Sequence, residues 1–290
     1  MRKLLIVLVV AILAAGAAFA TASCSNKTAV PGAVWANEEV AEYQIIRDNV
    51  VVGAMVIRME RLPAGSEVTL NATGETYSIG SSAHGTRVTV TASDSADPDN
   101  VWLYGESIMD RFTSVASYRK MNYGGENYEL KAHFSGKYYY YTLNGGKEER
   151  IRVGKSGFLD REHMFTIVRC YDIEAGYSGS YKIADPFSGE AVKISVAAAG
   201  EVAFSNPVEV VDFAGNSETR ATTLCTAVTF SRTETPQGKP VTVLYSKADG
   251  LEAKGDPASS DAAGGTSSVR VPVQIIENDV TYNLVRISAK

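Results

Sequence analysis

The sequence contains few of the residues that most enzyme chemistry requires. It has three histidines and three cysteines in 290 residues, and His84, His133 and His163 lie far apart. None of the histidines has a second histidine or cysteine at the spacing of a metal site, so we expect no metal and no cofactor. A Gly-x-Ser-x-Gly elbow and a complete phosphate-binding loop are also missing. We therefore predict a protein that is not an enzyme.

The sequence also lacks an excess of positive charge. Lys and Arg number 28 against 33 Asp and Glu, which gives a formal net charge of -5 at pH 7. Binding to nucleic acid depends on neutralising phosphates with basic side chains, so a nucleic-acid partner is disfavoured. The same acidic balance argues against attraction of the folded part to anionic lipid.

Long hydrophobic runs are limited to one segment near the N-terminus. Residues 4–15 are apolar, follow Arg2 and Lys3, and are followed by small residues that extend to Cys24. A membrane-spanning helix needs about 20 apolar residues, and this run is shorter. The pattern predicts a secretory signal peptide over residues 1–23 and hence an exported protein of the periplasm or cell envelope.

Two processing routes fit the end of this leader. Ordinary cleavage would follow residues 18–20 or 20–22, whereas lipoprotein processing would leave Cys24 as an acylated first residue. Residues 21–24 resemble the bacterial lipoprotein box, although Thr21 stands where that box usually has leucine. If Cys24 is acylated, we expect membrane attachment through the lipid anchor alone, each buried methylene contributing about 0.8 kcal/mol.

The other two cysteines, Cys170 and Cys225, leave two alternatives open. An exported protein meets an oxidising environment, in which the two could form a disulfide. Their distance along the sequence gives no geometric support for such a bond, and free cysteines are often small buried residues. We favour two buried thiols over the disulfide.

Helical periodicity is scarce, and strand-forming residues dominate from residue 41 onward. The chain has 15 tyrosines and many Val and Thr, with Gly, Asn and Asp between runs of strand length. Residues 43–59 predict two strands about a turn at Asp48 and Asn49, with a bulge or a close backbone approach at Gly53. Residues 112–153 predict an antiparallel meander, and residues 269–287 predict a final hairpin.

One segment predicts a helix of about three turns. Asp160 can cap it, Glu162 lies in its first turn, and it would end before Gly176. Adjacent residues point apart on a helix, so we expect Glu162 and His163 on a solvated surface. Arg169 would need a carboxylate or carbonyl partners if it turned inward, and an ion pair or a solvated position is favoured over ligand capture.

Four consecutive tyrosines place aromatic rings on both sides of one predicted strand. These are Tyr138, Tyr139, Tyr140 and Tyr141, and each ring combines apolar area with a hydroxyl group. They could line a groove for a lipid or another amphiphile. Ordinary packing in the core is the favoured alternative.

The mature chain is long enough for one large β domain or two small ones. We predict an N-terminal linker over residues 24–40 and a β domain over residues 41–290, with a subdivision near 200–207 as an alternative. Residues 247–268 are rich in small residues and have almost nothing to bury, so they predict a flexible surface insertion.

Several segments in order resemble the domain-of-unknown-function family 3108 of exported bacterial proteins. They are the opening hairpin with Val52 and Gly53, residues 107–112 and 117–120, residues 164–169 with 176–177, and the C-terminal part with Cys225, 243–246 and 271–273. The insertion 247–268 departs from this pattern, because the family has a shorter turn there. The resemblance implies a strongly curved antiparallel sheet or open β-barrel, similar to the half-barrels of periplasmic lipoprotein carriers, with one short helix packed on it. It implies no known activity.

The sequence leaves two candidate functions. The first is a non-catalytic binding module for a hydrophobic or amphiphilic ligand, which the curved sheet and the aromatic strands favour. The second is a structural or assembly factor that binds another envelope protein through an exposed edge or face of the sheet.

Overall fold

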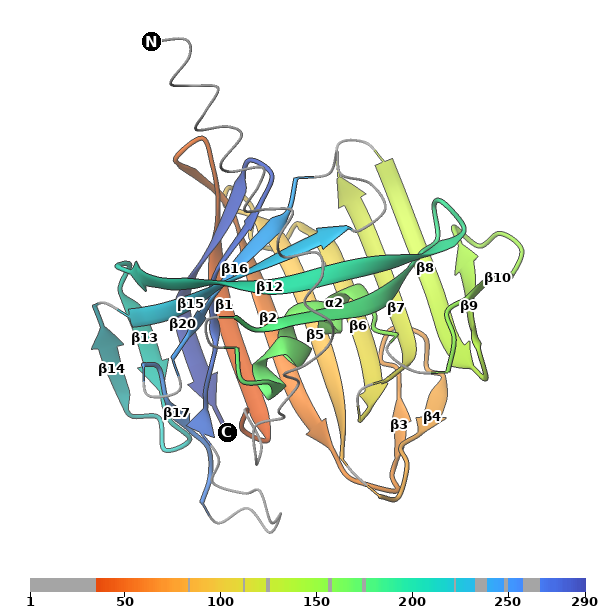
Figure 1. The fold of residues 1–290 in the computed structure, drawn as a ribbon, viewed down its shortest axis with the longest axis horizontal. Helices are drawn as coiled ribbons and strands as arrows, with labels where there is room; N and C mark the ends of the chain where they lie inside the picture. The colour runs from red at the N-terminus through yellow and green to blue at the C-terminus, as the bar shows by residue number, and fades with distance from the viewer. Residues whose placement is uncertain are drawn as a thin grey trace.

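The computed structural model describes residues 35–290, apart from 83, 112, 124–125, 156–157, 174–175, 222, 233–238, 248–249 and 258–266. The predicted signal peptide and Cys24 lie outside the described residues. The described part is mainly β with one short helix, as Figure 1 shows. This confirms the predicted fold class.

Sixteen strands form one sheet. They are β1 (Glu38–Arg47), β2 (Val50–Leu62), β5 (Gly85–Asp94), β6 (Val101–Asp110), β7 (Thr113–Tyr123), β8 (Glu126–Ser135), β9 (Tyr138–Leu143), β10 (Glu149–Arg152), β11 (Ser178–Asp185), β12 (Glu190–Phe204), β13 (Val208–Val211), β14 (Ser217–Arg220), β15 (Thr223–Arg232), β16 (Val241–Ser246), β19 (Pro272–Glu277) and β20 (Val280–Ala289). Two small strand pairs lie outside it, β3 (Glu67–Thr69) with β4 (Thr76–Ser78) and β17 (Ala253–Lys254) with β18 (Ser267–Ser268).

Strand order follows the sequence over most of the sheet. The order is β10-β9-β8-β7-β6-β5-β2-β1-β20-β19-β16-β15-β12-β11, and β13 and β14 are attached beside β20. The pairing of β13 with β20 is parallel, and the other pairings of this sheet are antiparallel. The first and last strands, β1 and β20, are neighbours in the middle of the order.

The predicted turns form where the sequence places them. Asp48 and Asn49 have φ values of 51° and 62°, so both adopt the left-handed conformation of a two-residue hairpin turn between β1 and β2. Asn278, with φ 57°, also adopts the left-handed conformation, in the turn between β19 and β20. A Cβ atom at Gly53 would lie 2.3 Å from the carbonyl oxygen of Ser93, which confirms the expected close backbone approach.

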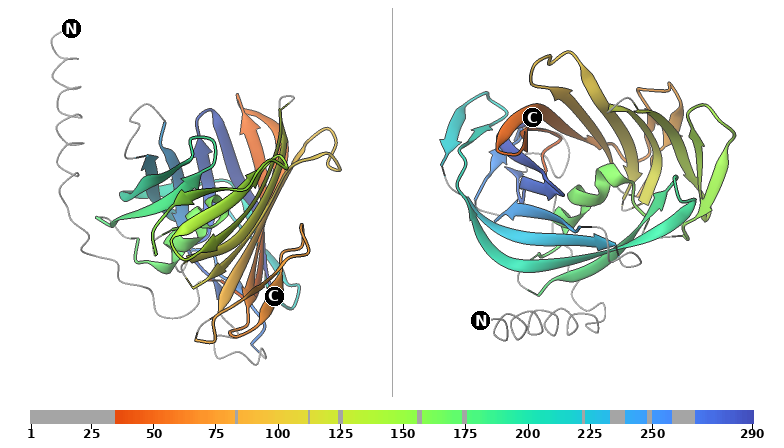
Figure 2. Two further views of the ribbon diagram at one scale, coloured as in Figure 1. Left: turned by 90° about the vertical axis from the view of Figure 1, so that its right-hand side faces the viewer. Right: turned by 90° about the horizontal axis from the view of Figure 1, so that it is seen from above.

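The sheet curves until its two end strands face each other, as the right panel of Figure 2 shows. No ladder of hydrogen bonds joins β10 to β11 among the described residues. Side chains fill the seam: Tyr139, Ile151 and Phe158 pack in one cluster with Ala184 and Ala191 across it. The sheet is therefore a nearly closed, barrel-like structure.

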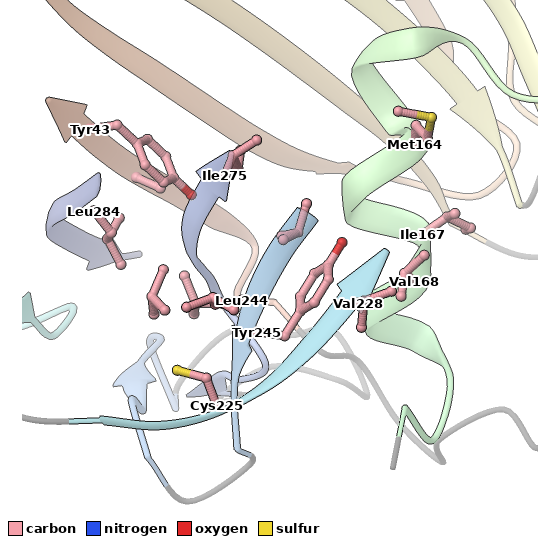
Figure 3. Close-up of a cluster of buried hydrophobic side chains, with 14 of the residues drawn as sticks. Tyr43, Met164, Ile167, Val168, Cys225, Val228, Leu244, Tyr245, Ile275 and Leu284 are labelled. Carbon is pink, nitrogen blue, oxygen red and sulfur yellow. The ribbon is translucent and has the colours of Figure 1, made fainter. Parts of the chain in front are cut away.

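The main core lies inside this curved sheet (Figure 3). Inward side chains such as Tyr43, Val228 and Leu284 pack with Ile167 of the helix. The buried Tyr245 hydroxyl donates to the backbone carbonyl of Phe165 at 2.7 Å, so it is satisfied in the core. Each large apolar side chain removed from water contributes about 1.5–3 kcal/mol.

The helix α2 (Arg161–Ile167) is shorter than predicted and continues as a single 3-10 turn, η2 (Val168–Cys170). Asp160 occupies the N-cap position, but its side chain makes no capping hydrogen bond. Its carboxylate accepts instead from the hydroxyl of Ser107 at 2.8 Å, and its N–H donates to Ser114 Oγ at 2.6 Å. These bonds attach the start of the helix to strands β6 and β7.

Three expectations about domain organisation need correction. Val196 and Val208 belong to one core cluster on either side of the suggested boundary at 200–207, so that core spans it. Leu251 and Ala253 are completely buried, so the predicted insertion 247–268 contributes to the core. Strand β1 begins at Glu38, inside the predicted linker 24–40, and Trp35 is already buried.

Candidate functional site

A cavity of about 260 Å³ is lined by residues of the curved sheet and of helix α2. Its walls are largely apolar and come from β1, β2, β5, β6, β7, β8, β19, β20 and the helix, with Met55, Ile57, Val90, Leu103 and Phe165 among the lining residues. Inward-facing positions of neighbouring strands supply these side chains, because alternate residues of a strand point to the same face. The cavity is therefore part of the same inner surface that forms the core.

One end of the cavity reaches the surface. Two of its lining residues, Arg161 and Phe187, are exposed to solvent. Phe187 lies in the turn between β11 and β12 and stacks on Tyr128 of β8, with ring centroids 5.0 Å apart. This contact spans the seam of the sheet next to the cavity.

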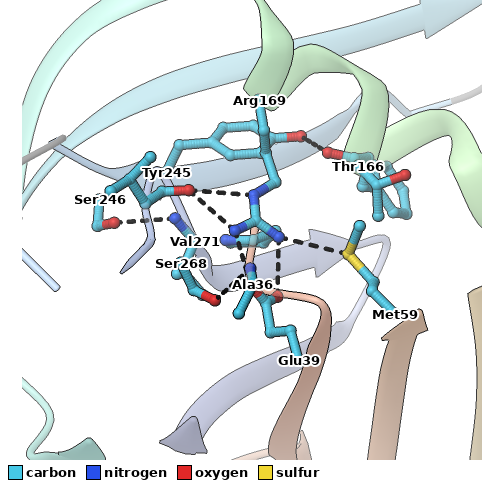
Figure 4. A network of polar contacts seen from close by, with 12 residues as sticks. Ala36, Glu39, Met59, Thr166, Arg169, Tyr245, Ser246, Ser268 and Val271 are labelled. Atoms are coloured by element: carbon cyan, nitrogen blue, oxygen red, sulfur yellow. Dashed lines mark hydrogen bonds and ion pairs between the residues drawn. The ribbon is translucent and has the colours of Figure 1, made fainter. Parts of the chain in front are cut away.

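The cavity lining includes a completely buried arginine–glutamate pair (Figure 4). Arg169 donates from both terminal nitrogens to the two carboxylate oxygens of Glu39, each at 2.8 Å. It also donates to the backbone carbonyl of Val269, and the Trp35 ring lies 5.7 Å from the guanidinium. Burial lowers the pKa of Arg169, but the charge and hydrogen bonds of Glu39, with smaller effects of Tyr43 and Cys170, raise the net pKa. The expectation of a structural ion pair is confirmed.

A second pair, Arg119 with Glu162, lines another part of the cavity wall. Arg119 Nε donates to Glu162 Oε1 at 2.7 Å, and Nη2 donates to the same oxygen. The side chains are 17% and 6% exposed, so the pair is largely shielded from solvent. Burial lowers the pKa of Arg119, but the charge and hydrogen bonds of Glu162 together with nearby Tyr128 and Tyr139 raise the net pKa above its ordinary value.

A third pair lies at the exposed end of the cavity. Arg161 Nη2 approaches Glu277 Oε1 to 3.0 Å, with side-chain exposures of 60% and 32%. It connects the start of α2 to the end of β19. Solvent screens such a pair, so its contribution to stability is small.

Two buried titratable groups flank Glu162 on the same segment. Burial raises the pKa of Asp160 to about 6, and the neighbouring Glu162 adds to this, against smaller lowering effects of Ser107 and Arg119. Burial lowers the pKa of His163 to about 4, against the raising effects of Glu162 and the Thr86 backbone. Hence His163 is neutral at pH 7.

The expected solvated position of Glu162 and His163 was wrong. His163 is completely buried, and Glu162 is drawn to Arg119. The periodic pattern missed this because the helix lies inside the curved sheet and is covered on more than one side. The sequence signal that could have identified Arg119 was a charged residue on an otherwise apolar strand face. Its cross-strand neighbours on that face are Gly105 of β6 and the buried Leu130 of β8.

The four tyrosines of β9 are not among the residues that line this cavity. Tyr139 and Tyr141 are buried in the cluster that fills the seam, as ordinary core residues. Tyr138 and Tyr140 are half-buried, and Tyr140 stacks on His133 with ring centroids 5.1 Å apart. A ligand-lining role for these tyrosines stays a prediction.

Cys170 and Cys225 are free thiols in the structure, so the disulfide alternative is not formed. Burial raises the pKa of Cys170 to about 11 and that of Cys225 to about 12, which disfavours a reactive thiolate at either position. The proposed acylation of Cys24 concerns a residue outside the described part of the chain.

No cluster of three or more His, Cys, Asp or Glu side chains among the described residues could hold a metal ion. No helix within them combines the length and apolar character needed to cross a bilayer.

Comparison with known proteins gives a likeness among solved structures. No family model matches the chain, and no curated protein matches it. Among solved structures, it is similar to a "Beta-barrel-like Protein of Domain of Unknown Function DUF1849 from Brucella abortus", with a TM-score of 0.46 and 13% sequence identity. The match covers 89% of this chain and 100% of that chain.

Proposed function

We propose that this protein is a non-catalytic binding module whose cavity holds the apolar chain of a hydrophobic or amphiphilic ligand. The observation that carries the proposal is the apolar cavity of about 260 Å³ inside the curved sheet. Small-molecule sites are concave, mostly apolar and supplied with a few placed polar groups, which is the arrangement described above.

The size of the cavity limits the ligand. Its volume, about 260 Å³, is slightly below the range of roughly 300–1,000 Å³ found for drug-sized ligands. One acyl chain or a compact amphiphile suits this space better than a lipid with two chains. Burying about eight methylenes would contribute roughly 6 kcal/mol, which corresponds to a dissociation constant of tens of micromolar.

The cellular setting belongs to the same proposal. The signal-peptide pattern of residues 1–23 supports export to the periplasm or cell envelope, and Cys24 is the proposed acylation site. Membership of the domain-of-unknown-function family 3108 is proposed on the sequence resemblance. Under this proposal, the anchor places the cavity near a membrane that supplies acyl chains.

A fluorescent fatty-acid analogue tests the proposal directly. The purified protein should enhance the fluorescence of the probe, and Val90→Trp, which fills the cavity, should weaken binding by about tenfold or more because the chain loses its space. Val101→Trp is the matched control: Val101 is exposed on β6 and is not a lining residue, so binding should change less than twofold. The proposal would be contradicted if the folded protein did not bind the probe, or if the Val90→Trp variant bound it as tightly as the wild-type protein does.

The second candidate, an assembly factor that binds another envelope protein, is favoured by one surface feature. Val50, Val51 and Val52 at the start of β2 and Val101 at the start of β6 are exposed. Strand β5 lies between β2 and β6, so these valines gather at one end of the sheet. Exposed apolar patches mark interaction surfaces, and crosslinking in cells should then capture one dominant partner that is lost with Val51→Asp.

A further inference from the structure

The charges of the residues that line the cavity sum to zero. Three are arginines and three are glutamates, namely Arg119, Arg161, Arg169, Glu39, Glu162 and Glu277. Each arginine is paired with one of the glutamates. Burying a ligand that carries a net charge would add an uncompensated charge to this site, so the lining favours a neutral ligand.

One oxygen in this lining has no hydrogen-bond partner among the residues that the structure describes. Both hydrogen bonds from Arg119 go to Oε1 of Glu162, and no described group donates to the buried Oε2. The Glu162 side chain is 6% exposed and belongs to the cavity lining. A buried carboxylate oxygen without a donor is unfavourable, and a ligand in the cavity is placed to supply one.

Strand β6 makes room for this carboxylate. Gly105 lies opposite Arg119 in the β6–β7 register, and a Cβ atom at position 105 would lie 2.8 Å from Glu162 Oε1. Any other residue would displace the end of the Glu162 side chain. The position of the free oxygen therefore depends on three residues from β6, β7 and α2.

We propose that the ligand is a single-chain amphiphile with a neutral head that donates a hydrogen bond to Glu162 Oε2, as a hydroxyl or amide does. This inference rests on the proposed function and assigns the chemical class of the ligand. The apolar chain occupies the cavity, and the head completes the unpaired side of the Arg119–Glu162 pair. A carboxylate head places a second negative charge against Glu162, so a fatty acid should bind through its chain and more weakly than a neutral amphiphile.

Two isomers separate the head from the chain. Decan-1-ol and nonyl methyl ether contain the same atoms, but only the alcohol donates a hydrogen bond. Displacement of the fluorescent fatty-acid analogue should show that the alcohol binds roughly tenfold more tightly than the ether or better, since hydrogen bonds to charged groups are the stronger ones. Decanoate at pH 7.5 should bind more weakly than the alcohol.

Variants test whether Glu162 is the source of this preference. Gly105→Ala shifts only the end of a flexible side chain and should lower the alcohol-to-ether ratio while leaving the ether affinity within about threefold. Arg119→Leu combined with Glu162→Leu removes the pair without leaving a buried charge, and its ratio should fall to about one. Circular dichroism confirms that each variant is folded.

The possible outcomes are distinct. If both isomers bind wild-type protein equally, or if the ratio is unchanged in both variants, the head-group assignment fails while the cavity proposal stands. Tighter binding of decanoate than of decan-1-ol also overturns the assignment. If neither isomer nor the fluorescent probe binds, the cavity proposal fails and this inference fails with it.

Discussion

The two buried arginine–glutamate pairs of the cavity differ in how completely they are satisfied. Arg169 spreads its donors over both oxygens of Glu39, a backbone carbonyl and an aromatic face. Arg119 directs two donors at a single oxygen of Glu162, and the second oxygen is left without a donor from the described protein. The protein itself supplies the hydrogen bonds of the first pair, whereas one carboxylate oxygen of the second pair can still accept a hydrogen bond.

The difference separates a structural pair from a candidate binding pair. A buried ion pair is stable only when hydrogen bonds satisfy its remaining atoms, and Arg169–Glu39 meets this condition. It joins η2 to β1 and to the segment before β19, which are 130 and 100 residues away in sequence. An incomplete pair that lines a cavity indicates a place for a ligand group.

The largest expected effect is the loss of stability when the Arg169–Glu39 pair is broken. Glu39→Gln leaves the completely buried Arg169 without a compensating charge and should lower the free energy of unfolding by about 3–5 kcal/mol. Glu162→Gln is the matched change in the other pair and should cost less, about 1–3 kcal/mol, because Arg119 is partly exposed. Urea unfolding of both variants measures the difference.

A double variant controls for loss of packing. Arg169→Met with Glu39→Leu removes both charges and should be more stable than Glu39→Gln alone. Equal destabilisation by Glu39→Gln and Glu162→Gln would show that the two pairs do not differ as described.

The next effect is a dependence of stability on pH near the incomplete pair. His163 has a folded-state pKa of about 4 against 6.5 when unfolded. The unfolded chain therefore binds the proton first, and stability falls on the order of 3 kcal/mol as the pH drops from 6.5 to 4. Asp160, with a folded-state pKa of about 6 against 3.8 when unfolded, acts in the opposite direction and gains a similar amount over pH 6 to 4.

Two isosteric substitutions separate these opposing contributions. His163→Asn should remove the loss in acid, and Asp160→Asn should make the loss steeper, because the compensating protonation is gone. Urea midpoints between pH 7 and pH 4 measure both slopes. If the two variants change the slope in the same direction, the assignment of opposite signs is wrong.

The smallest expected effect concerns the exposed pair at the end of the cavity. Arg161→Ala breaks its contact with Glu277, and the free energy of unfolding should change by about 0–1 kcal/mol, because solvent already screens both groups. Thermal unfolding with and without 0.5 M salt measures this. A loss comparable to that of Glu39→Gln would mean that this pair also has a structural role.

Local features of the fold could be predicted from the sequence. The turns at Asp48–Asn49 and Asn278 follow from residues that tolerate positive φ, and the alternation along residues 128–132 gave the buried face of β8. The short strands β3, β4 and β14 were missed, because three or four residues are too few to establish a period.

Most of the candidate site could not be predicted from the sequence, because it is formed by segments that lie far apart along the chain. Glu39 fell within the predicted linker, and nothing local connects it with Arg169, which is 130 residues away. The tyrosine strand carries aromatic rings on both sides as predicted, but the sequence could not show that Tyr139 and Tyr141 pack in the cluster that fills the seam. Which inward face becomes a cavity is decided by the curvature of the whole sheet.

The pairing of β1 with β20 has a consequence for biosynthesis. Nine residue pairs join these strands, which are separated by more than two hundred positions in the chain. Strand β1 emerges from the ribosome early and must wait, with one edge open, until nearly the whole polypeptide has been made. Folding of such long-range β structure is slow, so the newly made chain should complete this sheet only after its synthesis is nearly finished.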